Sequence, residues 1–170
     1  MFDPKKIIEV LNKHQVEYIV IGGVAASLHG CPEQTYDVDI LYNNSNDNKK
    51  RLLDALDKMG ARWDIPLTSK VLDRQYVFAL NTKHGYLDIF NYVAGSGYYK
   101  DSIKYREVSK YSDMDIRILN LEGFIKSKEA VIEEERNPRK LSAFQYIKDL
   151  YGLKKEMDIE NKIDEPELKL

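Results

Sequence analysis

Three aspartates in two apolar segments are the residues of this chain best suited to chemistry. Asp37 and Asp39 alternate with apolar residues in the segment 36–41, and Asp88 lies within the apolar segment 86–92. Because side chains alternate between the two faces of a strand, Asp37 and Asp39 are expected to share one face. Burying such carboxylates costs several kcal/mol unless something neutralises them, and two on the same face also repel each other.

A divalent cation would relieve both the burial cost and the repulsion. Mg²⁺ or Mn²⁺ prefers oxygen ligands and leaves coordination positions for water and phosphate. The sequence therefore predicts that Asp37, Asp39 and Asp88 bind Mg²⁺ (or Mn²⁺). The alternative is that these aspartates lie on the solvent face of a half-exposed sheet, each paired with a lysine or an arginine.

A glycine pair follows the first apolar segment. Gly22 and Gly23 lie between a strand expected over residues 18–21 and a short helix expected over 24–28. This arrangement lets backbone N–H groups and the helix N-terminus face an anion such as a phosphate. Neither the Walker phosphate-binding motif nor the dinucleotide-binding G-x-G-x-x-G is present. The alternative is a tight connection with no ligand, which the conformational freedom of glycine also permits.

Composition excludes several classes of protein. The chain has 170 residues, of which 43% are hydrophobic and 32% charged, with a net charge of -2. This balance excludes a disordered polyelectrolyte and a globally basic nucleic-acid coat protein. The only cysteine, Cys31, excludes an internal disulfide and a cysteine-based zinc cage. No apolar run is long enough to span a membrane and no secretory signal is evident, so we expect a cytoplasmic protein with no membrane partner.

Hydrophobic periodicity predicts an α/β (α+β) domain with a mixed sheet flanked by helices and a short C-terminal helical piece. The predicted strands are residues 18–21, 36–41, 75–80, 86–92, 105–111 and 114–119, with a five-residue hairpin loop at 81–85. The predicted helices are one that begins at Asp3 and Pro4, then 24–28, 49–59, 122–135 and 141–153. We expect a core over residues 1–120, helices over 121–153 packed on it, and a charged tail over 154–170 that forms a frayed helix, a docking arm or a disordered segment.

The joint pattern resembles the DNA polymerase β-like nucleotidyltransferase superfamily, which has a glycine turn, paired acids on the next strand and a third acid on a later strand. It is most similar to the small branch of the AbiEii-type toxins, whose stretch runs approximately I-G-G-x-A-x-x-x-H-G-x-x-R-x-T-x-D-[IVL]-D. Here residues 21–39 are IGGVAASLHGCPEQTYDVD. The likeness is sharp over residues 18–41, fair around Asp88 and looser over 121–130, LEGFIKSKEA, which is similar to L-x-x-L-I-x-x-K.

The resemblance implies a nucleotidyltransferase-type fold and a catalytic role for each acid. Asp37 and Asp39 would bind the metal, and Asp88 would complete the metal site and activate the attacking hydroxyl. The activity implied is transfer of a nucleoside monophosphate from an NTP to an acceptor hydroxyl. Acceptors in the superfamily include tRNA ends, proteins and small molecules.

The resemblance also implies a nucleotide-binding set. It comprises Gly22 and Gly23 at the turn, Ser27 in the following helix, Thr35 before the acidic strand, and Lys128 at the position of the family's lysine. For Lys128 the alternative is a solvated lysine on a helix.

One departure favours a second function. Glu33 stands where the branch has an arginine, and a negative group there would repel a triphosphate. The alternative to an enzyme is therefore a catalytically degenerate binding or regulatory protein on the same fold. Such a protein would act with a cognate partner protein, for example as one half of a toxin–antitoxin or defence pair.

Three further features have both a functional and a structural explanation. His29 lies at the branch's histidine position, or it is a packing histidine at a helix end. Cys31 is expected to be a small buried residue. Several of the 12 tyrosines lie near basic residues in the segment 99–111, where they could stack single-stranded nucleic acid or fill half-buried strand positions.

Overall fold

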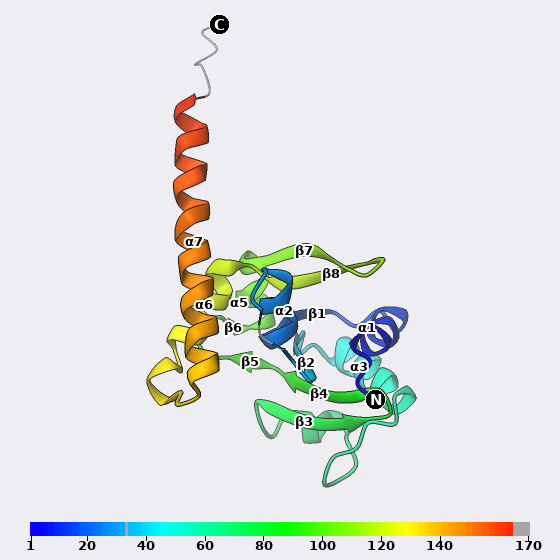
Figure 1. Cartoon of the computed structure of the whole chain (residues 1–170). Helices are drawn as coiled ribbons and strands as arrows, with labels where there is room; N and C mark the ends of the chain where they lie inside the picture. Colours follow the sequence, from blue (N-terminus) through cyan, green and yellow to red (C-terminus); the bar gives the residue numbers. More distant parts are fainter. Residues whose placement is uncertain (33, 165–170) are drawn as a thin grey trace, which may run out of the picture.

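A six-stranded sheet flanked by helices forms the body of the protein, and a long C-terminal helix extends away from it (Figure 1). The computed structural model describes residues 1–32 and 34–164, and for residues 162–164 it describes the backbone alone. The mixed α/β architecture confirms the predicted fold class. The strands of the sheet are β1 Tyr18–Ile21, β2 Asp37–Tyr42, β3 Val77–Thr82, β4 Gly85–Phe90, β7 Arg106–Tyr111 and β8 Met114–Leu119, and a separate hairpin contains β5 Tyr92–Val93 and β6 Gly97–Tyr98.

Helices precede, cover and follow the sheet (Figure 1). The helices are α1 Pro4–Lys13, α2 Gly22–Leu28, α3 Asn46–Lys58, α4 Ser69–Leu72, α5 Tyr99–Ser102, α6 Leu121–Glu129 and α7 Pro138–Asp164, with 3-10 turns η1 Ile103–Tyr105 and η2 Ile132–Glu134. None of the described helices combines the length and apolar character needed to cross a membrane.

The order of the strands brings β4 directly beside β2. The sheet runs β3-β4-β2-β1-β8-β7. β2 is parallel to β4 and antiparallel to β1, whereas β1 is parallel to β8. The sheet is therefore mixed, with antiparallel hairpins β3–β4 and β7–β8 at its two edges.

The two faces of the sheet differ in character. Val38 and Ile40 of β2 point into the main hydrophobic core, which α1 and α3 cover on that face. The opposite face carries Asp37 and Asp39, and next to them Leu41 joins a smaller apolar cluster. The side-chain period of two therefore separates the acids from the main core, as the sequence indicated.

The hairpin between β3 and β4 differs from the expected one. Instead of a five-residue loop at 81–85, only Lys83 and His84 connect the strands. The Thr82 hydroxyl donates to the Gly85 carbonyl (2.7 Å) and accepts from the His84 N–H (3.1 Å). Gly85 has a φ of 119°, a conformation that glycine adopts without strain, so the strands continue closer to the turn than periodicity suggested.

The helix ends also differ from the prediction. α3 begins at Asn46 instead of 49, because the Ser45 hydroxyl accepts the Asn48 N–H (3.3 Å) and caps the helix. α6 ends at Glu129 instead of 135, and a short 3-10 turn follows it. α7 runs from Pro138 to Asp164, so the expected boundary at residue 153 lies inside a helix; the last part of the expected tail, 165–170, lies outside the described residues.

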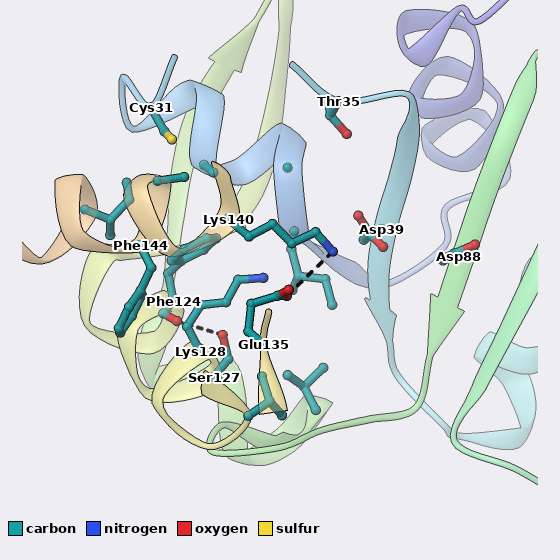
Figure 2. Close-up of a pocket in the computed structure, with 18 of the residues that line it drawn as sticks. Cys31, Thr35, Asp39, Asp88, Phe124, Ser127, Lys128, Glu135, Lys140 and Phe144 are labelled. Atoms are coloured by element: carbon teal, nitrogen blue, oxygen red, sulfur yellow. Dashed lines mark hydrogen bonds and ion pairs between the residues drawn. The ribbon is translucent and has the colours of Figure 1, made fainter. Parts of the chain in front are cut away.

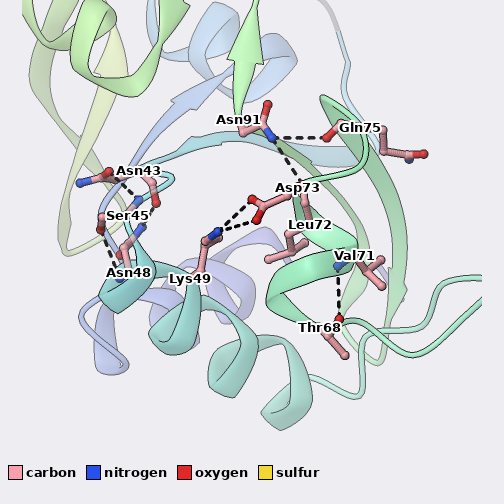
Figure 3. Close-up of polar contacts among 10 residues, drawn as sticks. All are labelled: Asn43, Ser45, Asn48, Lys49, Thr68, Val71, Leu72, Asp73, Gln75 and Asn91. Carbon is pink, nitrogen blue, oxygen red and sulfur yellow. Dashed lines mark hydrogen bonds and ion pairs between the residues drawn. The ribbon is translucent and has the colours of Figure 1, made fainter.

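Polar contacts at the N-terminus of α3 tie this helix to the sheet (Figure 3). The fully buried Asn48 side chain donates to the carbonyls of Glu17 (2.9 Å) and Asn43 (2.7 Å) and accepts the Glu17 N–H (2.7 Å). The next residue, Lys49, is also buried, and its ammonium group lies 2.8 and 3.0 Å from the two carboxylate oxygens of Asp73. Because the Lys49 charge is removed from water, it depends on this single carboxylate.

We predict that Asp73→Asn lowers the free energy of unfolding by about 2 kcal/mol, because it leaves the buried Lys49 charge without its ionic partner. Adding Lys49→Met should recover most of the loss. Urea denaturation measures both variants. The matched control is Asp115→Asn, which breaks the ion pair between Asp115 and Lys110. The side chains of Lys110 and Asp115 are 72% and 64% exposed, so this substitution should lower the free energy of unfolding by less than about 1 kcal/mol. Equal losses at the two sites would contradict the role of burial.

Candidate active site

The parallel register of β2 and β4 assembles the three aspartates. Asp39 on β2 lies directly opposite Asp88 on β4, and Asp37 lies two residues earlier on the same face as Asp39. One carboxylate oxygen from each lies within 4.8 Å of the others. None of the three forms a salt bridge with a described lysine or arginine, so one basic partner for each aspartate does not describe this site.

The acidic cluster opens into a cavity of about 610 Å³. One wall is formed by β2 and β4, a second by the start of α2, and a third by α6, η2 and the first turns of α7. The third wall includes apolar side chains, and Figure 2 shows Phe124 and Phe144 there, away from Asp39 and Asp88. The cavity therefore joins a charged end at the strands to an apolar end between helices.

Gly22 packs closely against Asp39, and Gly23 packs closely against Thr35. Gly22 has a φ of 63°, and a Cβ at this position would overlap the Asp39 carboxylate. At Gly23 a Cβ would lie 2.6 Å from Thr35 Oγ1. Both positions therefore require glycine, Gly22 for its left-handed conformation and close approach and Gly23 for the close approach alone. Both glycines line the cavity.

Thr35 positions one of the acids. Its hydroxyl lies 3.0 Å from the Asp37 carboxylate and 3.1 Å from the Asp37 carbonyl, and it can donate to either. The expected contact of Thr35 with the start of the acidic strand is therefore present. Thr35 therefore helps to orient the Asp37 side chain.

Asp39 is the most strongly perturbed acid in the cluster. Burial, followed by the carboxylates of Asp37 and Asp88, raises the pKa of Asp39 to about 7. Lys128 and a hydrogen bond from the Gly23 N–H oppose the shift. Burial and Asp37 also raise the pKa of Asp88. The protein groups around the cluster thus do not fully neutralise its carboxylates.

The donor set fits a hard divalent cation. The three side chains offer only carboxylate oxygens, which Mg²⁺ and Mn²⁺ prefer, and they converge closely enough to share one ion. A cation would favour the ionised forms that burial and mutual repulsion disfavour. Asp37, Asp39 and Asp88 are therefore the described residues suited to hold such an ion.

Two lysines extend into the cavity from the helical wall (Figure 2). Lys128 on α6 was expected at the site from the sequence. Lys140, in the first turn of α7, was not, because nothing in the sequence relates it to the acids. The carboxylate of Glu135 lies 3.9 Å from the Lys140 ammonium group. The backbone N–H of Asn137 is the main cause of the lowered pKa of Glu135, and the charges of Lys140 and Lys128 add to it.

The other sequence candidates lie elsewhere or have structural roles. Ser27 does not line the cavity; it is exposed and donates to the Val24 carbonyl (2.8 Å). His29 is buried and its Nε2 contacts the Leu119 carbonyl (2.7 Å), so the packing explanation fits it. Cys31 is buried, as expected, and lines the apolar end of the cavity. Glu33 lies outside the described residues.

The tyrosines that line the cavity, Tyr36 and Tyr92, lie outside the segment 99–111. The basic, tyrosine-containing segment 99–111 leads into β7, which is the outermost strand and three positions from β2. Its lysines and arginine do not line the cavity. Tyr92 does, and it contacts Tyr76 and Tyr98 with ring centroids 5.2 and 5.1 Å apart. These three exposed rings form an aromatic wall beside the end of β4.

Comparison with known proteins identifies the fold. No protein-family model matches the chain, and no curated protein sequence matches it. Among solved structures, ANT(2'')-Ia in complex with adenylyl-2''-tobramycin has a TM-score of 0.62 at 14% identity, covering 89% of this chain and 88% of that one. The lincosamide antibiotic adenylyltransferase LnuA with lincomycin bound has a TM-score of 0.58 at 15% identity, covering 85% and 94%.

A third similar structure is TM1012 from Thermotoga maritima, described as a candidate nucleotidyltransferase. It has a TM-score of 0.54 at 16% identity and covers 93% of this chain and 96% of that one. The chain therefore has the nucleotidyltransferase fold, in agreement with the superfamily resemblance of its sequence.

The pKa of Asp39 predicts how stability depends on pH in metal-free protein. Asp39 titrates near 7 when folded and near its ordinary value of 3.8 when unfolded, so stability falls as pH rises between these values. Asp39→Asn removes this titration. In EDTA at about pH 8, the free energy of unfolding of the variant should exceed that of wild type by about 2 kcal/mol. This difference should shrink as the pH falls toward about 4.

Urea denaturation across this pH range measures the effect. Mg²⁺ should then stabilise wild type at the higher pH and leave Asp39→Asn nearly unchanged. A variant that is less stable than wild type by the same amount at every pH would show that Asp39 is not held in an unfavourable charged state.

Proposed function

We propose that this protein is a metal-dependent nucleotidyltransferase that moves a nucleoside monophosphate from an NTP to an acceptor hydroxyl. The observation that carries the proposal is the convergence of three carboxylates within 4.8 Å beside a glycine turn in an open cavity. The nucleotidyltransferase fold and its likeness to two antibiotic adenylyltransferases support it.

The acids divide into two roles. Asp37 and Asp39 would hold the cation, and a cation bound there would supply positive charge beside the phosphates and the reacting oxygens. Asp88 shares the metal site and accepts the proton of the acceptor hydroxyl, and its raised pKa makes it a stronger base than an ordinary carboxylate. The acceptor oxygen forms a bond to the α-phosphorus, the bond to the β-phosphate oxygen breaks, and pyrophosphate leaves.

The triphosphate has a matching surface between the glycine turn and the helical wall. The Gly22 and Gly23 N–H groups lie at the start of α2, and Lys128 and Lys140 extend toward the acids from the opposite side of the cavity (Figure 2). If a triphosphate bound between the glycine turn and the two lysines, Lys140 would contact a phosphate in place of Glu135. Thr35 keeps Asp37 in place and Ser27, which lies outside the cavity, has no part in this arrangement.

A small molecule is the acceptor class that the surroundings favour. The basic residues of segment 99–111 do not line the cavity, and β7 lies at the far edge of the sheet, whereas the end of β4 that carries Asp88 is bordered by the aromatic wall of Tyr76, Tyr92 and Tyr98. Such rings suit the apolar face of a sugar or a ring system. The two adenylyltransferases of similar fold were solved with a tobramycin product and with lincomycin.

The sequence likeness to AbiEii-type toxins supports a finer placement. We propose that the chain is related to that branch and acts beside a cognate partner protein. Incubation with NTPs labelled at the α-phosphate and cell extract separates the acceptor classes, since label appears in a small molecule, a protein or RNA. Label in RNA or protein would contradict the small-molecule acceptor but not the transferase activity.

We predict that Asp88→Asn lowers the rate of labelling by at least about 100-fold with little change in NTP binding, because the amide keeps the size of the side chain and cannot accept the proton. Thermal-shift titration with Mg²⁺ and each NTP measures binding. Asp115→Asn, an exposed change on β8 away from the cavity, is the control and should retain full activity.

Two outcomes would separate enzyme from binding protein. If wild type binds an NTP but labels nothing, the degenerate, regulatory function is favoured. If Asp88→Asn labels as fast as wild type, the assignment of the general base is wrong.

A further inference from the structure

The second half of α7 has no packing partner among the described residues. The first half packs Phe144 and Ile147 against α6 and α2, and these two side chains are buried. From Gly152 to Asn161, in contrast, every side chain is exposed. Figure 1 shows this part of the helix extending away from the body of the protein.

A free helical extension of this kind is unfavourable in water. Helices shorter than about 12–15 residues are marginal without tertiary packing. Gly152 lies where the helix leaves the body, and glycine in an exposed helix costs about 1 kcal/mol relative to alanine. The extension therefore calls for a partner that covers it.

An apolar stripe on α7 shows which face the partner covers. Tyr146, Leu150, Leu153 and Met157 follow one another at spacings of 4, 3 and 4 residues, the pattern of a two-helix seam. Tyr146, Leu153 and Met157 are 43%, 57% and 60% exposed. At 3.6 residues per turn, this seam lies about a third of the way around the helix from the face buried against α6. The body of the protein therefore leaves Tyr146, Leu153 and Met157 accessible, whereas Leu150 is half-buried at the edge of the cluster that packs α7 against α6.

The charges that flank the seam fit a second copy of the same helix in parallel. Asp149 directly precedes the seam residue Leu150, and Lys154 directly follows the seam residue Leu153. In a parallel pair of helices, these positions place each Asp149 beside the Lys154 of the other copy. In an antiparallel pair Asp149 would face Glu156 or another Asp149, and like charges would meet. Two opposite-charge contacts related by symmetry thus favour the parallel arrangement.

We propose that the protein forms a homodimer in which two α7 helices pair in parallel along the seam of residues 146, 150, 153 and 157. The arrangement has two-fold symmetry and closes with two copies. The same helix contributes Lys140 and Phe144 to the cavity wall. Pairing of the distal half therefore braces the wall of each candidate active site.

Sedimentation equilibrium of the full chain over a range of concentrations tests the dimer. Wild type should approach twice the monomer mass of 19.8 kDa as concentration rises. Leu153→Glu should weaken the dimer by at least about tenfold, since it places a charge in the seam. The matched control is Ile159→Glu, which alters an equally exposed apolar residue (59%) on nearly the opposite side of the helix and should leave association unchanged. Circular dichroism checks that both variants fold.

A charge exchange tests the parallel orientation. Asp149→Lys and Lys154→Asp should each weaken the dimer several-fold, and the double variant should restore it because each pair is re-formed with reversed sign. A wild type that stays monomeric at every concentration would overturn the proposal, as would equal effects of Leu153→Glu and Ile159→Glu. A double variant that is weaker than either single one would overturn the parallel arrangement.

Discussion

Three like charges held together by neighbouring strands impose the constraint on which the rest of this structure depends. The residues that alternate with Asp37 and Asp39 on β2, and with Asp88 on β4, are fully buried in the main core. Burial of such side chains contributes about 1.5–3 kcal/mol each, and it fixes both strands whatever the acids on the other face prefer. Because β2 and β4 are parallel and in register, the core on one face forces the carboxylates together on the other.

The surrounding elements accommodate this unfavourable cluster. The left-handed conformation of Gly22 lets the chain turn into α2 in contact with Asp39. The missing side chain at Gly23 leaves room for Thr35, which supports Asp37. The helices α6 and α7 add lysines at a distance and close the apolar end of the cavity. Protonation of Asp39 relieves the repulsion within this cluster at low pH, and a bound cation would relieve it while all three acids stay ionised.

Much of this arrangement follows from the sequence, and the reason is local. The period of two in segment 36–41 places Asp37 and Asp39 on one face, and the glycine pair marks the turn before α2. The ends of elements were less predictable, because capping by Ser45 and the turn around Gly85 depend on single side chains and backbone angles. The sequence left open whether the helix continues beyond residue 153, since this charged segment has no apolar stripe that packs on the body of the protein.

The sequence also did not predict which residues far apart in the chain lie close together. Nothing in the sequence relates Lys140 or Tyr92 to Asp39, because their proximity arises from how the helices and the β5–β6 hairpin fold back over the sheet. Conversely, Ser27 lies on α2 as expected but faces outward, because a helix of seven residues has too few apolar positions to show from the sequence which side is buried.

The most direct measurement of the central claim is anomalous diffraction from crystals grown with Mn²⁺ and a non-hydrolysable NTP analogue. The account predicts a manganese peak bonded to the carboxylates of Asp37 and Asp39, next to Asp88, with the triphosphate of the analogue lying toward Gly22 and Gly23. Clear density for the three aspartates without a manganese peak between them, at saturating Mn²⁺, would contradict it.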